Sequence, residues 1–384
     1  MATATLARQI GRAITKATNS TGSGNGWFSP HMAAASRAIA ERIPLVDLVL
    51  EVRDARIPLS SAYDQLRNHT SSSKRIIVMN KMDLANHSQL KDWMKYFEQK
   101  NYISYGVNAH NKESIQQGGK CLFLKPVRSW WNNYKLQGRV RELKKVDQSS
   151  HTTTILLVGI PNVGKSALAN SLHRIGRISA AEKGKLKHAT VSPQPGETKN
   201  ITGLKIASHP NFYVLDTPGV LPPHILDDEV CTKLALTGTI QDCFAGEKEL
   251  AQCFLSILNR SDEYKKWAKL SNSENERSFA DRNIECSTSS EMGMKRKRQY
   301  PTDHTQDFIV HDVRRTLFEV ISSFDGNVED ERLIEEELKA MHAAFQVPLE
   351  SEHYAQNKIA AKLLNLFRTG RLGHYILDSI PRKL

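Results

Sequence analysis

The chain has 384 residues, 40% of them hydrophobic, and a net charge of +12 from 53 basic and 41 acidic residues. This length and composition allow two domains with packed cores. No uninterrupted apolar run is long enough to cross a membrane, so we expect no transmembrane segment. The basic excess favours a polyanionic partner such as RNA, although a basic presequence and solvated basic surfaces would also account for it.

The first 26 residues have the composition of an organelle presequence. They contain Arg and Lys but no acidic residue, and Leu6, Ile10 and Ile14 recur every four residues. This spacing predicts a basic amphipathic helix, which is typical of a mitochondrial transit peptide. We therefore assign residues 1–26 to a transit peptide. The alternative is a disordered tail without a targeting role.

Two apolar stretches, Val46–Val52 and Arg75–Met79, predict buried strands. The second is followed by an N-K-x-D sequence, and open α/β sheets bind their ligands at the carboxyl ends of strands. The carboxylate of Asp83 can accept both N1–H and the exocyclic amine of guanine, a pair of donors that adenine lacks. Asn80 and Lys81 would brace the loop and cover the base. By itself this tetrapeptide is a weak signal, because four polar residues occur by chance.

A third predicted strand, Tyr102–Val107, ends in Asn108 and Ala109. A turn at this point of a GTP-binding sheet gives a backbone N–H to the guanine carbonyl, usually from a Ser-Ala pair. Asn108 stands where Ser is usual, so a plain turn at the end of the strand is the alternative.

A phosphate-binding loop is predicted at Gly159–Ser166, which fits G-x-x-x-x-G-K-[ST]. The strand Thr154–Val158 precedes it and a helix follows it. Backbone N–H groups of such a loop face phosphate oxygens. Lys165 should reach the β- and γ-phosphates, and the Ser166 hydroxyl should bind Mg²⁺. The residues of this loop and helix expected to contact nucleotide are Asn162, Val163, Gly164, Lys165, Ser166 and Ala167.

The order of these motifs is unusual. In ordinary GTPases the phosphate loop precedes the base-reading sequence, whereas here Asn80–Asp83 precedes Gly159–Ser166. The same strands can still lie side by side if the chain is circularly permuted. The residues between the two motifs include a basic stretch, Trp130–Val146, that we expect to be helical.

Two switch segments follow the phosphate loop. Thr198, in a Pro-Gly-Glu-Thr sequence, is expected to bind Mg²⁺ and the γ-phosphate, although a simple Pro-Gly turn is the alternative. In Asp216-Thr217-Pro218-Gly219, Asp216 should contact Mg²⁺ and the Gly219 N–H should contact the γ-phosphate. Many GTPases follow this glycine with a Gln that orients the attacking water. Val220 cannot do so, and we expect slow intrinsic turnover.

Five motifs in this order, Asp54–Arg56, Asn80–Asp83, Gly159–Ser166, Pro195–Thr198 and Asp216–Gly219, resemble the circularly permuted GTPases of the YlqF/RbgA type. With the presequence, the chain is similar to the plant mitochondrial DAR GTPases. The resemblance implies a permuted P-loop sheet followed by a carboxyl-terminal helical domain. It also implies GTP hydrolysis, stimulated by the mitochondrial ribosomal large subunit and its rRNA, that is coupled to assembly of that subunit.

The resemblance also suggests a catalytic residue and a second cation. The family sequence W-F-P-G-H-M corresponds to Trp27–Met32, which implies that His31 replaces the missing Gln; a surface histidine without a role is the alternative. GTPases with Asn at the position of Asn162 are often activated by K⁺. We therefore expect Mg²⁺ and K⁺ as cofactors, and Lys165, Thr198 and Gly219 beside His31 in the hydrolytic site.

The fold predicted is an α/β class, with a circularly permuted GTPase domain over 27–222 and a small helical RNA-binding or ribosome-binding domain over 223–384. A disordered insertion is expected over about 259–306, because this segment is polar and poor in aliphatic residues. Its basic run Lys295–Arg298 can contact RNA, act as a nuclear signal or remain solvated. The predicted helices that follow are Phe308–Phe324, Glu329–Ala344 and Tyr354–Phe367.

Two other functions fit the same motifs. One is a scaffold that binds GTP without hydrolysing it. The other is a GTPase that acts on tRNA modification or on a protein partner, with no role in ribosome assembly.

Overall fold

The structure is a computed structural model and describes residues 2–20, 27–67, 74–111, 114, 152–179, 200–208, 211–225, 227–268, 304–347 and 352–381. The helices in these segments are α1 (Ala2–Ser20), α2 (Pro30–Arg42), α3 (His87–Gln99), α6 (Lys165–Ser179), α7 (Asp228–Leu236), α8 (Glu247–Arg260), α10 (His304–Ser323), α11 (Glu331–Ala344) and α12 (Glu352–Arg368). The strands are β1 (Leu48–Asp54), β2 (Arg75–Asn80), β3 (Ile103–Gly106), β4 (Thr152–Val158), β5 (Thr202–Ser208) and β6 (Asn211–Asp216).

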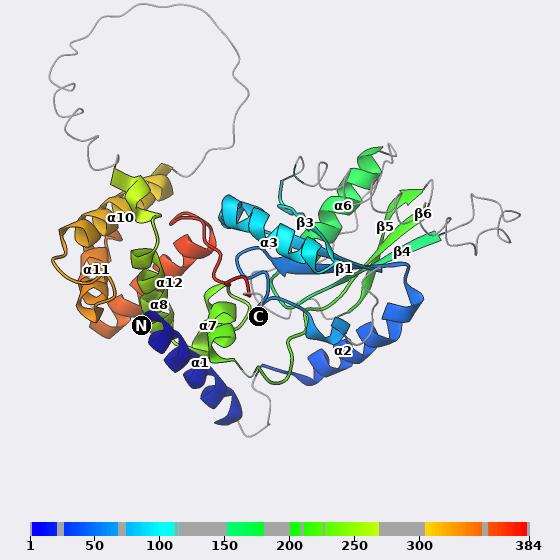
Figure 1. The fold of residues 1–384 in the computed structure, drawn as a ribbon, viewed down its shortest axis with the longest axis horizontal. Coiled ribbons are helices and arrows are strands. Elements are labelled where there is room, and N and C mark those ends of the chain that lie inside the picture. Colours follow the sequence, from blue (N-terminus) through cyan, green and yellow to red (C-terminus); the bar gives the residue numbers. More distant parts are fainter. Residues whose placement is uncertain are drawn as a thin grey trace, which may run out of the picture. The chain divides into compact units, whose positions relative to one another are not determined.

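The strands form one sheet with the order β3-β2-β1-β4-β6-β5 (Figure 1). All neighbours are parallel except β5 and β6. The base-reading strand β2 and the phosphate-loop strand β4 therefore flank the first strand of the chain, β1. This order confirms the predicted α/β class, and it is the order that a circularly permuted P-loop sheet requires.

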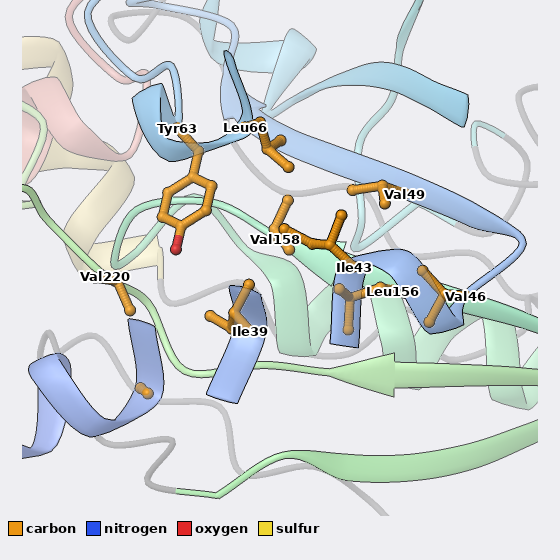
Figure 2. Packing of buried hydrophobic residues seen from close by; sticks show 10 residues of the cluster. Ile39, Ile43, Val46, Val49, Tyr63, Leu66, Leu156, Val158 and Val220 are labelled. Atoms are coloured by element: carbon orange, nitrogen blue, oxygen red, sulfur yellow. The ribbon is translucent and has the colours of Figure 1, made fainter. Parts of the chain in front are cut away.

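Two apolar clusters cover one face of the sheet. Side chains alternate between faces along a strand, and residues paired across parallel strands share a face. Val49 pairs with Leu156, and Glu51 pairs with both Val158 and Ile77. The cluster around α2 contains Val49, Leu156 and Val158 (Figure 2). By this register it lies on the same face of the sheet as the cluster around α3, which contains Ile77.

The chain separates into two compact units. One comprises Ile10–Ala245 and His374–Leu384 and contains the sheet; we call it the sheet unit. The other comprises Met1–Gln9 and Gly246–Gly373 and contains α8, α10, α11 and α12; we call it the helical unit. Inside the helical unit, Phe254 of α8 stacks on Phe367 of α12 with ring centroids 4.5 Å apart.

These limits differ from the predicted domain boundaries. The sheet unit continues past residue 222 through α7, and the last residues of the chain return to it. The polar segment predicted as an insertion starts inside α8, and its 3₁₀ turn Tyr264–Trp267 buries Trp267. The rest of that segment up to residue 303, including Lys295–Arg298, lies outside the described residues, as do Trp130–Val146 and Pro195–Thr198.

The predicted amphipathic helix at the amino terminus is present as α1. Its Ile10 and Ile14 are buried, as the four-residue spacing indicates for one face of a helix. Arg12 pairs with Asp228 of α7 at 3.4 Å, and a side chain at Gly11 would collide with the Asp228 backbone. Among the described residues, no helix is both long and apolar enough to span a membrane.

Candidate functional site

The phosphate-binding loop joins β4 to α6, the strand-loop-helix context that its sequence requires. Gly159 has φ +152° and Gly164 has φ +91°, conformations that residues with a Cβ rarely adopt. A side chain at Gly159 would collide with the carbonyl of Val52, and one at Gly164 would collide with the amide of Asn80. Both glycines are therefore needed for the loop to lie against β1 and the base-reading sequence.

Lys165 begins α6 and is buried, with its Nζ donating to the Ile160 carbonyl of the same loop at 2.8 Å. Burial lowers the pKa of Lys165 to about 8, an effect that the charge of Asp216 partly offsets. A buried ammonium at the helix amino terminus is a strong site for an anionic phosphate. The arrangement supports the predicted role of Lys165.

Asp216 ends β6 and is fully buried, and both of its carboxylate oxygens lack a hydrogen-bond partner among the described residues. Burial raises the pKa of Asp216, and the Lys165 charge only partly opposes this. A buried carboxylate with unused lone pairs beside a hydroxyl fits a hard divalent cation. Ser166 and Asp216 are thus the residues that would hold Mg²⁺, whereas Thr198 lies outside the described residues.

Asn80 connects three loops that come from distant parts of the chain. It ends β2 and is 2% exposed. Its Nδ2 donates to the Val163 carbonyl of the phosphate loop at 2.8 Å, and its Oδ1 accepts the Ala109 N–H at 2.9 Å. The base-reading sequence, the turn after β3 and the phosphate loop therefore meet at one side chain, and the predicted bracing role of Asn80 has a definite geometry.

Lys81 is held by a buried carboxylate at the end of the neighbouring strand. Asp54 accepts the Lys81 Nζ at 2.9 Å, and Arg56 Nε and Nη2 at 3.0 and 2.7 Å. Burial alone would raise the pKa of Asp54, but the charges of Arg56 and Lys81 hold it well below its ordinary range. The backbone of Lys81 is left-handed, with φ 59°. Asp54 therefore fixes a strained residue two positions before Asp83.

Asp83 lies in the 3₁₀ turn Met82–Leu84, and its side chain is exposed, as a base-reading carboxylate must be. A backbone N–H of the Asn108–Ala109 turn was expected to bind the guanine carbonyl. The Ala109 N–H instead donates to the side chain of Asn80. Asn108 shapes this turn through its Oδ1, which accepts the His110 N–H at 2.9 Å. The contact of Asn108 and Ala109 with guanine stays a prediction.

The amino-terminal sequence predicted to supply the catalytic histidine lies beside the exit of the Asp216–Gly219 switch. Trp27 Nε1 donates to the Pro222 carbonyl at 3.0 Å, and Phe28 packs against the cluster that contains Val220. Ser29 caps α2 by accepting the Met32 N–H. His31, in the first turn of this helix, is exposed.

Gly219 lies against the phosphate loop, and Val220 lies in the core of the sheet unit. A side chain at Gly219 would lie 2.5 Å from Pro161 Cα, so this glycine permits close approach to the phosphate loop. Val220 is completely buried, so the residue in the usual place of Gln points into the core (Figure 2). Asn162, the residue linked to K⁺, donates through Nδ2 to the Gly238 carbonyl at 2.7 Å, so a cation could be contacted only through its Oδ1.

The sequence analysis missed the roles of Asp54 and Arg56, which entered only as part of a family resemblance. A signal was available, because Asp54 ends the strand next to the one that Asn80 ends. Carboxyl ends of parallel strands meet at one edge of a sheet, so an acidic residue there was placed to pair with Lys81.

Comparison with known proteins gives consistent matches. Residues 154–282 match a family described as 50S ribosome-binding GTPase. The chain is 57% identical to DAR GTPase 2, mitochondrial, of Arabidopsis thaliana, over 98% of this chain and 95% of that protein. It is 41% identical to Short integuments 2, mitochondrial, of the same plant, over 92% and 89%. It is 31% identical to ribosome biogenesis GTPase A of Bacillus cereus, over 61% and 71%.

Replacing Asn80 with Ala should weaken binding of GDP by about tenfold or more. The change removes the donor to Val163 and the acceptor for Ala109, and each lost hydrogen bond in a buried site costs about 1–3 kcal/mol. Calorimetric titration of GDP measures the effect. The control is Asn365→Ala, an exposed position of α12. Unchanged GDP affinity in Asn80→Ala would contradict the bridging role.

The affinity for GDP should depend on pH through Lys165. Phosphates bind the charged ammonium, so nucleotide binding should raise the pKa of Lys165 from about 8 and take up protons. Affinity should be flat below pH 8 and fall above it by up to about tenfold per pH unit. Titrations between pH 7 and 9, in buffers of different ionisation enthalpy, measure both effects.

Arginine at position 165 offers a control for this pH dependence. It stays charged over the whole range, so any affinity that Lys165→Arg retains should lack the dependence. A flat profile for the unmodified protein, with binding that takes up no protons, would show that Lys165 is already fully charged in the free protein.

Proposed function

This chain belongs to the family of circularly permuted GTPases that includes the DAR GTPases, and from that premise we propose that it hydrolyses GTP to time assembly of the mitochondrial ribosomal large subunit. Binding of guanine nucleotides and GTPase activity are properties of the family. The observation that supports the proposal is the junction at Asn80, where the three loops expected to bind the nucleotide meet. The role in ribosome assembly is proposed from relatives, one of which is named ribosome biogenesis GTPase A.

The proposed site holds its nucleotide with fixed groups rather than by covalent chemistry. Mg²⁺, when bound, neutralises charge between the β- and γ-phosphates. Ser166 and Asp216 would hold that ion, and Lys165 would supply positive charge to the phosphates from the phosphate loop. The Gly219 N–H and Thr198 are proposed to contact the γ-phosphate, so that the two switch segments order only with GTP.

Hydrolysis then requires a group that orients water, and Val220 cannot be that group because it is buried in the core. We propose slow intrinsic turnover for this reason, and stimulation by the large subunit. His31 is the candidate for the missing role, since its helix begins beside the switch exit, where Trp27 binds Pro222. K⁺ bound near Asn162 is a further proposed activator.

Mitochondrial localisation is proposed from two features. The relatives DAR GTPase 2 and Short integuments 2 are both named mitochondrial. Residues 1–26 also have a presequence composition. If they are removed on import, the surface of α7 that α1 contacts through Arg12 and Asp228 becomes exposed in the mature protein.

One observation favours a second candidate function. The burial of Val220 leaves no water-orienting side chain at the position where many GTPases carry it. A scaffold that binds GTP as a structural ligand without turnover would need no such group. Phosphate release over many turnovers in the presence of large subunits distinguishes the enzyme from the scaffold.

The proposed function predicts GTP-dependent association with mitochondrial large subunits. With a non-hydrolysable GTP analogue, the protein should sediment with these subunits, and with GDP it should stay in the free fractions. Lys165→Ala should remain free under both conditions, because it lacks the charge that holds the phosphates. Equal distribution of the unmodified protein with either nucleotide would refute GTP-timed assembly.

Replacing His31 with Ala should leave nucleotide affinity unchanged and slow subunit-stimulated hydrolysis by about 100-fold, the usual effect of losing a group that assists proton transfer or orients water. Arg37→Ala, an exposed position on the same helix, is the matched control. Phosphate release under single-turnover conditions is the measurement. Equal rates for His31→Ala and the control would remove His31 from the mechanism.

A further inference from the structure

The last described residues of the chain, His374–Pro381, form neither a helix nor a strand and belong to the sheet unit; we call this segment the C-terminal strap. The Tyr375 N–H donates to the Leu84 carbonyl at 3.3 Å, and the Leu377 N–H donates to the Arg56 carbonyl at 2.7 Å. Between them, Ile376 packs against the cluster around α3. The strap thus contacts two loops that are separated in sequence.

Asp378 anchors the strap with a buried carboxylate. Its Oδ2 accepts the backbone N–H groups of Leu59 and Ser60, both at 2.8 Å. Its Oδ1 accepts the Ser60 hydroxyl at 2.6 Å and the Lys233 Nζ at 3.1 Å. All four partners donate, and the ionised carboxylate of Asp378 accepts two of these bonds at each oxygen. Such charge-assisted bonds are about twice as strong as neutral ones.

One of the two loops that the strap contacts carries Asp83, and the other is linked to Lys81 through Asp54. Leu84 closes the 3₁₀ turn that carries Asp83. Arg56 begins the loop that Asp378 binds, and its guanidinium holds Asp54, which in turn holds Lys81. A 3₁₀ turn has poor hydrogen-bond geometry and is held mainly by its surroundings. The strap is therefore placed to set the positions of both Lys81 and Asp83.

We propose that Asp378 is a positioning residue for guanine recognition, and that the C-terminal strap completes the base-binding site from the far end of the chain. The proposal rests on the assignment of Asn80–Asp83 as the guanine site. Reading the guanine edge requires the Asp83 carboxylate to be held to within about 0.5 Å. The bonds to Leu84 and Arg56, secured by Asp378, supply that precision.

The test compares GDP with inosine diphosphate, which lacks the exocyclic amine that Asp83 is proposed to bind. In the full-length protein, Asp378→Asn replaces one carboxylate oxygen with an NH₂ group, which cannot accept hydrogen bonds. The loop that contains Leu59 and Ser60 should therefore lose its anchor to the strap. The Kd for GDP should rise about tenfold, equivalent to the loss of roughly one charge-assisted hydrogen bond. The Kd for inosine diphosphate should rise less, so the preference for GDP should fall by about threefold or more. Ile380→Ser, an exposed change in the strap, should leave the preference unchanged.

A double variant tests whether the effect passes through Asp83. In an Asp83→Ala background the amine contact is already lost, so adding Asp378→Asn should leave the ratio of the two affinities unchanged. A strap that only stabilises the fold would instead lower the melting temperature and weaken both nucleotides equally, which would overturn the proposal.

Ser60→Ala keeps the test decisive if Asp378→Asn does not fold. It removes only the hydroxyl bond at 2.6 Å, and the preference for GDP should still fall, by a smaller factor. An unchanged preference in this variant would overturn the proposal. If Asn80–Asp83 is not the guanine site, the unmodified protein should bind GDP no better than ADP. This result distinguishes an error in the site assignment from an error in the role of Asp378.

Discussion

The parallel pairing of β1 with β2 is the constraint on which the nucleotide site depends. It sets Asp54 opposite Asn80 at the carboxyl edge of the sheet. From this register follow the ion pair of Asp54 with Lys81 and the reach of Asn80 to Val163 and Ala109. A shift of one residue would turn these side chains to the opposite face. The site therefore exists only while the sheet keeps this register.

A second group of buried charges lies earlier along β1, away from the carboxyl edge. Glu51, fully buried in β1, accepts Arg53 and Arg75, and its pKa is lowered by their charges against the opposing effect of burial. Breaking a buried pair leaves an uncompensated charge, whereas replacing the whole group with apolar residues is often neutral for stability. These buried charges, and the Asp54 group, therefore fix one defined geometry more than they add stability.

Circular permutation changes what the ends of the chain can contact. The Asp216–Gly219 switch leads directly to Pro222, whose carbonyl accepts Trp27 from the amino-terminal sequence. The carboxyl-terminal end returns to the same unit and binds the loop after Arg56. Two segments far apart in sequence thus contact loops that we expect to bind the nucleotide: Trp27 lies beside the Asp216–Gly219 sequence, and the strap lies beside the Asn80–Asp83 sequence.

The motif residues and most of the strands could be predicted from the sequence because their signals are local. A phosphate loop needs Gly159 and Gly164 at fixed spacing, and buried parallel strands are continuous apolar runs. The order of the motifs was enough to predict the permuted sheet. Helix periodicity placed α10, α11 and α12 within a few residues of their ends.

Other features depend on contacts between residues that no local pattern connects. Asp378 is separated by more than 300 residues from Ser60, and a lone acidic residue near a chain end has no spacing that indicates a partner. The engagement of Ala109 by Asn80 and the boundary of the sheet unit at Ala245 have the same cause. The sequence by itself determined which chemical groups the site has. Only the tertiary structure decided which of them touch, because long-range contacts depend on how the sheet brings distant loops to one edge.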